Sequence, residues 1–477
     1  MHIVFLCSEY EGLLKTGGLA DATRGLAQAL KAQGHQITVL LPRYGVLYQR
    51  ELLPEWQSIY FALGEQHYGC AVRHLLEDGI SVALIEHHDF FARSRPYDDG
   101  YHAFADNALR FAFFCKAALC YLSESGIKAD VIHGHDWQTA LAAVYLKQMQ
   151  QQGKLLQSRF ILTIHNAAYQ QGIAQHDFKN LGLTPDDFAA GIAPSLLSLG
   201  VQHASALNTV SQGYRDELLS EPAANGLSAL YQARQSSFVG ILNGCDYGRW
   251  DPQTDKSLVA NYHSADLTGK QQCKTELRRQ MGLADSHAHN HNGQKVPLFV
   301  LVSRVTGQKG FDYLIPALTN WLGTCDAQVV MMGTGEQKYI QPLKALQQQY
   351  PLKYRFIEGF DEDFSHQLEA AGDFFLMPSL FEPCGLNQIY SLRYGTVPIV
   401  RATGGLKDTV VALPARNATG IHFVEPAEQD LIQALKSAEA LFQNQSKYQK
   451  VQQRGMQQYF GWDQAAEKYL HLYQQAQ

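Results

Sequence analysis

Short apolar runs alternate with helical patterns along the first half of this chain. The runs lie at residues 3–7, 37–41, 81–85, 131–133, 159–164, 206–210 and 238–242. Continuous apolar runs of this length are typical of strands that a parallel sheet buries on both faces. Helical stretches such as residues 108–122 separate them. Because a crossover helix joins neighbouring parallel strands, this alternation predicts an α/β fold with helices on both faces of the sheet.

The same pattern restarts at residue 297, after a polar stretch. Further runs follow at residues 329–333, 354–357, 374–377 and 397–400. We interpret residues 251–295 as a surface excursion. It ends in His287, His289 and His291, which we take as a solvated loop because no Cys or carboxylate joins them in a metal-binding pattern. A chain of 477 residues exceeds one typical core, so we expect domains at 1–250 and 251–456.

Composition narrows the class of protein. An apolar fraction of 46% and a charged fraction of 18% are those of a soluble globular protein. A net charge of −6 argues against nucleic acid or an anionic membrane as a partner. Eight cysteines without a Cys-x-x-Cys pair fit reduced thiols. The start lacks the basic region of a signal peptide, and no apolar run approaches the roughly 20 residues that span a bilayer. We expect a soluble cytoplasmic protein.

A glycine-containing loop follows the first predicted strand. Residues 15–18 read Lys-Thr-Gly-Gly. Glycines let backbone amides approach an anion, and Lys15 adds a positive charge. The spacing matches neither the dinucleotide fingerprint nor the P-loop. The alternative is a tight turn with a solvated lysine, and this motif alone does not decide between the two.

The first strand of the second half is followed by a comparable loop. Residues 303–310 include Arg304, Lys309 and Gly310. Two cations placed directly after a buried strand suit a diphosphate, since they can replace the metal ion that often stabilises such a leaving group. A basic pair on the surface is the alternative.

A single carboxylate stands on a constrained loop near residue 380. Glu382 lies between Pro378 and Pro383 and shortly before Gly385. The prolines fix the backbone, while Gly385 permits close approach to the start of the next helix. The loop suits a sugar hydroxyl on Glu382 and a phosphate at the helix start. An ordinary connection between a strand and a helix is the competing interpretation.

Two further strands end in polar motifs. Residues 133–137 read His-Gly-His-Asp-Trp, and residues 163–166 read Thr-Ile-His-Asn. Imidazoles and a carboxylate at strand ends fit acid–base work or contacts to sugar hydroxyls. A metal site lacks enough defined ligands. Histidines beside a strand can also be purely structural.

These motifs, with Leu-Asn-Gly-Cys-Asp at 242–246 and Thr-Gly-Gly-Leu at 403–406, occur in the order seen in bacterial glycogen synthases. The chain resembles that family over its whole length, and plant starch synthases more distantly. The resemblance implies a GT-B fold, in which two Rossmann-like domains face a central cleft that closes on the donor. It also implies that a C-terminal helix within 457–477 crosses back to the N-terminal domain.

The activity implied by the resemblance is retaining transfer of glucose from ADP-glucose to the non-reducing 4-OH end of an α-1,4-glucan, with release of ADP. The acceptor would be glycogen or a malto-oligosaccharide. No metal and no other cofactor would be needed. In this family mechanism the departing phosphate oxygen takes the acceptor proton on the same face of the sugar. The residues alone do not separate ADP-glucose from UDP-glucose.

The resemblance also implies roles for individual residues. Catalytic roles fall to Glu382, Arg304, Lys309, His165 and Asp136. Donor contacts fall to Lys15, Gly17, Gly18, Cys384, Gly385, Leu386, Thr403, Gly404, Gly405 and Phe360. Acceptor contacts fall to Asp21, Asp136, Asn166 and Asn243. Arg304 and Lys309 would hold the diphosphate, Glu382 the donor glucose, and Phe360 the base.

The chain departs from the family in places. The segment after Gly172 is shorter than usual, and Asn387 and Ser391 replace a usual threonine or serine and a usual glycine. These differences leave acceptor preference open. Two alternatives therefore stand beside the glucan-elongating enzyme: a retaining GT-B transferase with a small or lipid-linked acceptor, and a non-catalytic glucan-binding paralogue.

Overall fold

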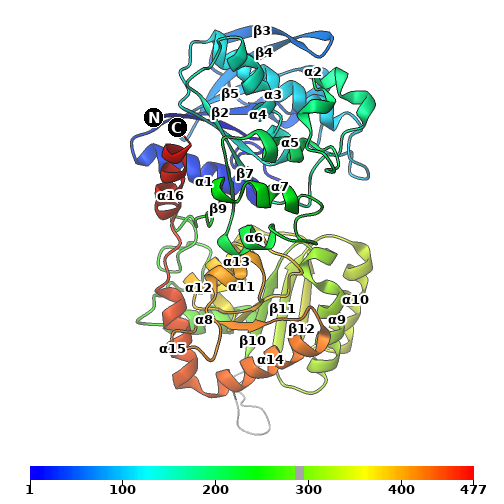
Figure 1. Ribbon diagram of the computed structural model, residues 1–477. Helices are drawn as coiled ribbons and strands as arrows, with labels where there is room; N and C mark the ends of the chain where they lie inside the picture. The colour runs from blue at the N-terminus through cyan, green and yellow to red at the C-terminus, as the bar shows by residue number, and fades with distance from the viewer. Residues whose placement is uncertain (285–294, 477) are drawn as a thin grey trace. The chain divides into compact units, whose positions relative to one another are not determined.

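The computed structural model describes residues 1–284 and 295–476, and the chain divides into two compact units (Figure 1). Unit 1 is Met1–Gly244 with Trp462–Gln477, and unit 2 is Cys245–Gly461. The sequence-based bounds at 250 and 456 fall a few residues from these. His287, His289 and His291 lie outside the described residues.

Unit 1 is built on a nine-stranded sheet in the order β3-β4-β5-β2-β1-β6-β7-β8-β9. Its strands are β1 (His2–Leu6), β2 (Gln36–Pro42), β3 (Trp56–Leu63), β4 (Gln66–Glu77), β5 (Ile80–Glu86), β6 (Val131–His135), β7 (Arg159–Ile164), β8 (Ala206–Thr209) and β9 (Phe238–Gly240). All pairs are parallel except β3–β4 and β4–β5. The pattern of apolar runs did not predict β3 and β4, because neither strand forms a continuous buried run, and β3 alternates between buried and exposed positions.

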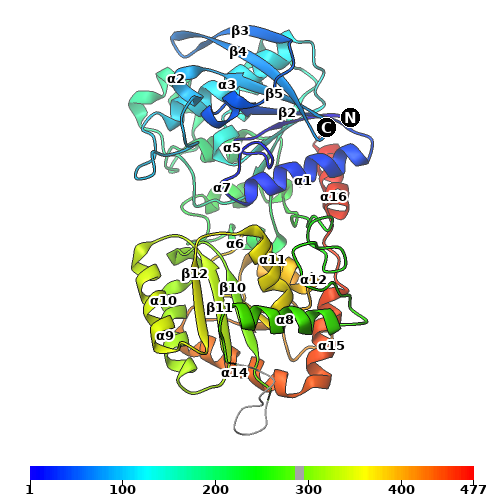
Figure 2. The same ribbon diagram turned by 180° about the vertical axis from the view of Figure 1, so that it is seen from behind.

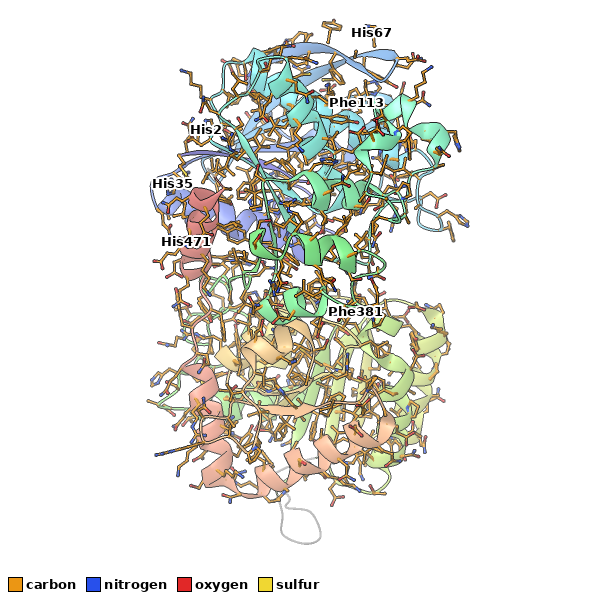
Figure 3. The ribbon with its side chains drawn as sticks, viewed as in Figure 1. His2, His35, His67, Phe113, Phe381 and His471 are labelled. Carbon is orange, nitrogen blue, oxygen red and sulfur yellow. The ribbon has the colours of Figure 1, made fainter. Side chains whose placement is uncertain are left out.

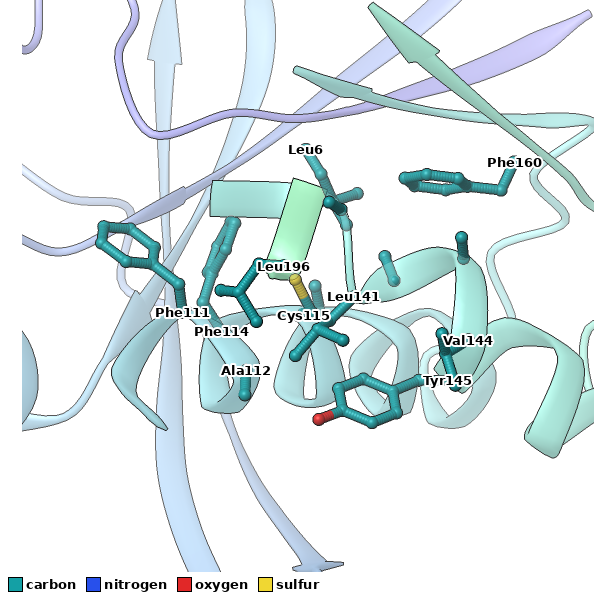
Figure 4. Close-up of a cluster of buried hydrophobic side chains, with 14 of the residues drawn as sticks. Leu6, Phe111, Ala112, Phe114, Cys115, Leu141, Val144, Tyr145, Phe160 and Leu196 are labelled. Atoms are coloured by element: carbon teal, nitrogen blue, oxygen red, sulfur yellow. The ribbon is translucent and has the colours of Figure 1, made fainter. Parts of the chain in front are cut away.

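Helices cover both faces of this sheet. They are α1 (Gly18–Ala32), α2 (His88–Phe91), α3 (Asn107–Glu124), α4 (Ala142–Gln151), α5 (Leu196–His203), α6 (Gln212–Glu217), α7 (Ser228–Ala233) and α16 (Trp462–Gln475). Leu6 faces the cluster under α3, α4 and α5 (Figure 4), while Phe5 faces the cluster under α1 and α16. Figures 1 and 2 both show α1 beside α16. The two pack so closely that a Cβ at Gly25 would lie 2.2 Å from Nε1 of Trp462. The predicted C-terminal helix thus belongs to unit 1.

Unit 2 contains a six-stranded sheet, parallel throughout, in the order β12-β11-β10-β13-β14-β15. Its strands are β10 (Leu298–Val302), β11 (Gln328–Gly333), β12 (Tyr354–Glu358), β13 (Phe374–Met377), β14 (Val397–Arg401) and β15 (Ile421–Phe423). Its helices are α8 (Thr268–Gln280), α9 (Phe311–Leu322), α10 (Gln337–Gln349), α11 (Glu362–Ala371), α12 (Asn387–Arg393), α13 (Gly404–Thr409), α14 (Glu428–Gln443) and α15 (Gln445–Met456). Residues of α9, α10 and α14 pack on one face of the sheet, and those of α8 and α11 on the other (Figure 2).

The expectation of a surface excursion over 251–295 was wrong for α8. This helix packs against α11 and buries Lys270 and Lys274. Lys274 pairs with Asp373 at 2.5 Å, and Lys270 donates to the carbonyl of Ala370 at 2.9 Å. Charged side chains can be buried when each has a partner, so polarity alone did not identify a surface segment. In neither described stretch of chain does a helix have the length and apolar character to span a bilayer.

Candidate functional site

The carboxyl ends of adjacent strands bring the predicted loops of unit 2 together. Strands β10, β13 and β14 are neighbours, and their C-terminal loops carry Lys309, Glu382 and Thr403. A pocket opens at this edge of the sheet. It is lined by Leu301, Val302, Ser303, Arg304, Lys309, Leu376, Met377, Pro378, Ser379, Glu382, Gly385, Leu386 and Asn387. Crevices at the carboxyl ends of strands are where open α/β sheets bind ligands.

Two loops of this pocket are joined by one backbone and one side-chain hydrogen bond. The amide of Leu380 donates to the carbonyl of Gln308 at 2.8 Å, and Nε2 of Gln308 donates to the carbonyl of Phe381 at 3.3 Å. Phe381, labelled in Figure 3, precedes Glu382 on the loop after β13. Gly310 has φ of 79°, and a Cβ there would lie 1.9 Å from the carbonyl oxygen of Pro378. Glycine is therefore required where these loops touch.

The predicted phosphate cation and the predicted sugar ligand form an ion pair. Nζ of Lys309 lies 2.5 Å from Oε2 of Glu382, with only 18% and 9% of the two side chains exposed. The hydroxyl of Ser379 donates to the same Oε2 at 2.9 Å. Arg304 is exposed beside them, with Nη2 3.4 Å from Oε1 of Gln308. The pocket thus holds a charge-compensated acid and an exposed guanidinium.

The remaining donor candidates of unit 2 differ in how they are placed. Gly385 and Leu386 line the pocket, whereas Cys384 is buried and is not part of the lining. The amide of Gly405 already donates to the carbonyl of Glu382 at 3.0 Å, and a Cβ at Gly405 would lie 2.2 Å from the carbonyl oxygen of Cys384. In this structure the packing of the two loops therefore uses the Gly405 amide, and a contact of Gly405 with the donor stays a prediction.

Three more predicted residues stand apart from the pocket lining. Thr403 and Gly404 begin α13, where Gly404 has φ of 43°. Phe360 follows β12 and is 69% exposed. Strand β11 separates β12 from β10, so the sheet does not bring Phe360 to the pocket wall.

The Lys15 loop of unit 1 is held by acids of its own unit. Nζ of Lys15 lies 2.6 Å from Oδ1 of Asp21 and 3.3 Å from Oε1 of Glu11. The buried carboxylate of Glu9 accepts hydrogen bonds from the amides of Thr16 at 2.6 Å and Gly17 at 3.2 Å. In this structure the Gly17 amide is therefore bonded to Glu9, and its contact with a phosphate stays a prediction. Sequence reasoning missed Glu9, whose position directly after β1 was the available signal.

Asp21 has an unusual protonation equilibrium. Burial raises the pKa of its carboxyl group to about 6, although the nearby Lys15 ammonium acts in the opposite direction. Gly18, the next predicted contact, is the first residue of α1. A Cβ added at Gly17 or Gly18 would meet no atom within 4 Å, so packing does not demand glycine at either position.

Asp136 joins β6 to the loop after β7. Its Oδ1 accepts from the amides of His165 at 2.6 Å and Asn166 at 3.3 Å, and its backbone has φ of 57°. Burial raises the pKa of the Asp136 carboxyl group to about 7, despite these two backbone donors. The predicted acid therefore also fixes the loop that carries His165 and Asn166.

His165 lies in a buried group of imidazoles. Its Nε2 is 3.1 Å from Nδ1 of His135, and burial lowers the pKa of His165 to about 3. Oδ1 of Asn166 accepts from the amide of Ala168 at 3.0 Å. Asn243 is buried after β9, and its Oδ1 has no hydrogen-bond partner among the described residues. Strands β6 to β9 are neighbours, so these side chains follow one edge of the sheet.

No group of three His, Cys, Asp or Glu side chains in residues 1–284 and 295–476 is arranged to hold a metal ion. The polar groups at the strand ends are instead cations, single acids, neutral imidazoles and amides. Such groups suit hydroxyl-rich and phosphate-bearing ligands.

Family models match both halves of the chain. The starch synthase catalytic domain matches residues 2–233, and the group 1 glycosyl transferases match residues 284–458. A glycogen synthase from Aliivibrio salmonicida is 38% identical over 99% of this chain and 98% of its own length. One from Aeromonas salmonicida is 37% identical over 100% of this chain and 98% of its own length.

Among solved structures, the catalytic domain of starch synthase IV from Arabidopsis thaliana, bound to ADP and acarbose, superposes with a TM-score of 0.88. It is 30% identical, and the match covers 100% of this chain and 99% of that one. These full-length similarities confirm the predicted GT-B class and the predicted glycosyltransferase activity. The chain therefore belongs to the glycogen and starch synthase family of GT-B glycosyltransferases.

Proposed function

We propose that this protein is a glycogen synthase, which transfers glucose from ADP-glucose to the non-reducing 4-OH end of an α-1,4-glucan with retention of configuration. ADP is the other product. The observation that carries the proposal is the pocket of unit 2, where the partly buried Lys309–Glu382 pair lies beside the exposed Arg304. The name of the Aliivibrio salmonicida relative, glycogen synthase, supports the proposal, as do the ADP and acarbose bound to the Arabidopsis enzyme.

In this proposal the donor diphosphate binds Lys309 and Arg304. A diphosphate carries more negative charge than one carboxylate, so it competes with Glu382 for the Lys309 ammonium. Glu382 then accepts a hydrogen bond from a hydroxyl of the donor glucose. The two cations offset the charge that grows on the departing diphosphate, and for this reason we propose that no metal is required.

Further donor contacts are proposed at residues of both units. In unit 2 these are Cys384, Gly385, Leu386, Thr403 and Gly404, with Phe360 for the base. In unit 1 the Lys15 loop would contact phosphate, with Lys15 leaving Asp21 and Glu11 to do so. Because the amide of Gly17 is already bonded to Glu9, Lys15 and the start of α1 at Gly18 are the stronger candidates in this loop.

The chemistry proposed for the sugar does not use a covalent intermediate. Glu382 is the only carboxylate among the described residues that line the pocket, and its Oε2 is held by Lys309 and Ser379. A double displacement would need a second carboxylate about 5 Å from the first. We therefore propose that the acceptor attacks on the face that the diphosphate leaves, and that the departing oxygen takes the acceptor proton.

Unit 1 would supply the acceptor contacts. We assign these to Asp21, Asp136, Asn166 and Asn243, with His165 near the reacting carbon. Glycogen or a malto-oligosaccharide is the proposed acceptor. With a net charge of −6, neither nucleic acid nor a membrane is expected as a partner, and a cytoplasmic location is proposed.

The test is donor turnover with glycogen, in the presence of a metal chelator. Radiolabelled ADP-glucose should transfer label into alcohol-precipitable polymer, and the chelator should not change the rate. UDP-glucose, run in parallel, tests the choice of base. Label in a small soluble product would instead support a transferase with a small acceptor. Absence of turnover with either donor would support a glucan-binding paralogue.

A further inference from the structure

Three histidines of unit 1, two of them buried, form a connected group that the proposed function uses only in part. His133 and His135 lie on β6, and His165 follows β7, the neighbouring strand. The ring centroids of His133 and His135 are 4.2 Å apart, and those of His135 and His165 are 5.3 Å apart. His133 and His135 are almost completely buried, so any effect they have on a ligand must be transmitted through other residues.

The position of the proton on His133 follows from its partners. The hydroxyl of Thr163 donates to Oδ1 of Asn208 at 2.7 Å, so Thr163 can only accept from Nε2 of His133 at 2.6 Å. Burial lowers the pKa of His133 to about 3, which leaves the ring neutral with one N–H. Nδ1 then accepts from the hydroxyl of Tyr473 at 2.8 Å. A neutral imidazole with its proton on Nε2 satisfies every contact.

The C-terminal helix holds this arrangement. Tyr473 of α16 bonds to His133, and Tyr469 of the same helix accepts from Nδ2 of Asn208 at 3.0 Å. The two tyrosines thus bond to both ends of the chain His133–Thr163–Asn208. Because the His133 ring packs against the His135 ring, α16 also limits how His135 can turn.

The hydrogen bond between Nδ1 of His135 and Nε2 of His165 can run in either of two directions. If Nε2 of His165 donated to Nδ1 of His135, the single proton of His135 would sit on its own Nε2. That atom is buried and meets no hydrogen-bond partner among the described residues. A buried N–H without an acceptor costs about 1–3 kcal/mol, and unpaired acceptors are tolerated more often than unpaired donors. The reverse arrangement, with Nδ1–H of His135 donating to Nε2 of His165, avoids the buried unpaired N–H.

We propose that His135 is a positioning residue that donates Nδ1–H to Nε2 of His165 and so fixes His165 with its own proton on Nδ1. His165 then acts as a neutral hydrogen-bond donor through Nδ1, and its Nε2 is not available as a base. Its target would be an oxygen of the sugar, and this last point rests on the proposed function. The assignment agrees with a reaction in which the departing phosphate oxygen, not a histidine, takes the acceptor proton.

The tautomer can be measured directly in the full-length protein. Long-range ¹⁵N–¹H correlation spectra of protein labelled at histidine nitrogens distinguish a proton on Nδ1 from one on Nε2. The His165 signal is identified by its loss in His165→Asn. We expect a neutral ring with the proton on Nδ1. A proton on Nε2 of His165 would overturn the proposal, whatever the enzyme assay shows, so this failure is separate from a failure of the proposed function.

Two substitutions at His135 then test its role. Asn places an amide N–H near the position of the imidazole Nδ1–H, whereas Leu fills the space without a donor. His135→Leu should lower kcat about tenfold, with little change in the KM for ADP-glucose, and should give a mixture of His165 tautomers. His135→Asn should stay within about threefold of the native kcat and keep the Nδ1 tautomer. A purely structural role would make both variants equally poor, or leave the His165 tautomer unchanged in His135→Leu.

Discussion

Both units place a lysine and a glycine after their first strand, but the two loops are held in different ways. In unit 2, Lys309 pairs with Glu382 in the pocket, and the exposed fractions of these two side chains are 18% and 9%. In unit 1, Lys15 pairs with Asp21 and Glu11, and 47% of the Lys15 side chain is exposed. Exposed ion pairs contribute little to stability. When an ion pair is shielded from water, removal of one partner is costly, because it leaves the other charge uncompensated.

The glycines of the two loops show the same contrast. A Cβ at Gly310 would collide with the carbonyl oxygen of Pro378, while a Cβ at Gly17 or Gly18 would meet nothing within 4 Å. Unit 2 therefore needs its glycine to assemble the pocket itself. In unit 1 the fold does not need the two glycines, which points to ligand approach as the reason for them. The unit 2 site is preformed by close packing, whereas the unit 1 loop is held by hydrogen bonds to Glu9 and by the ion pairs of Lys15.

The largest effect is expected from Lys309→Ala. This change removes the ammonium that would stabilise the departing diphosphate and leaves the buried carboxylate of Glu382 without its cation. Loss of one well-placed charge of this kind costs about 3 kcal/mol, or roughly a hundredfold in turnover. Initial rates of glucose incorporation into glycogen would measure it.

The matched control is Lys344→Ala, which removes a lysine of unit 2 that pairs with Glu358 on the surface. It should leave both turnover and stability nearly unchanged. Native turnover in Lys309→Ala would mean that the buried pair is structural. The contrast between the two loops would then have no catalytic meaning.

The glycine contrast gives the next largest effect. Gly310→Ala places a Cβ against Pro378 at a residue with φ of 79°, and should destabilise the fold by about 2–4 kcal/mol. Gly17→Ala should leave the midpoint of urea unfolding unchanged and lower only donor turnover. Unfolding monitored by circular dichroism, with an activity assay of each variant, separates the two outcomes. If both variants were equally stable, the distinction between a closely packed and an unpacked glycine would be wrong.

The sequence predicts most strands and the charged residues at their ends, but not the contacts by which loops and helices hold those residues. Apolar runs located most strands, and the cations and acids at strand ends were visible because they directly follow those runs. The bond from Glu9 to the amide of Gly17, the bond from Gly405 to Glu382 and the contact of Tyr473 with His133 were not predicted. Each depends on how loops and helices pack in three dimensions, and packing of this kind leaves no periodic pattern in the sequence.

The two acids at the strand ends give a further contrast. Glu382 has a lysine partner, whereas Asp136 is buried with backbone donors and pairs with no cation among the described residues. Because burial raises the pKa of Asp136 to about 7, the folded protein binds a proton there more tightly than the unfolded chain does. The contribution of Asp136 to stability therefore falls as the pH rises from about 4 to 7.

In Asp136→Asn the side-chain amide oxygen can still accept from the backbone amide of His165, but the side chain no longer titrates. The unfolding free energy of this variant, relative to the native protein, should rise by about 3 kcal/mol over that range. Urea unfolding at a series of pH values measures the difference, and parallel pH profiles for the two proteins would show that Asp136 is charged throughout.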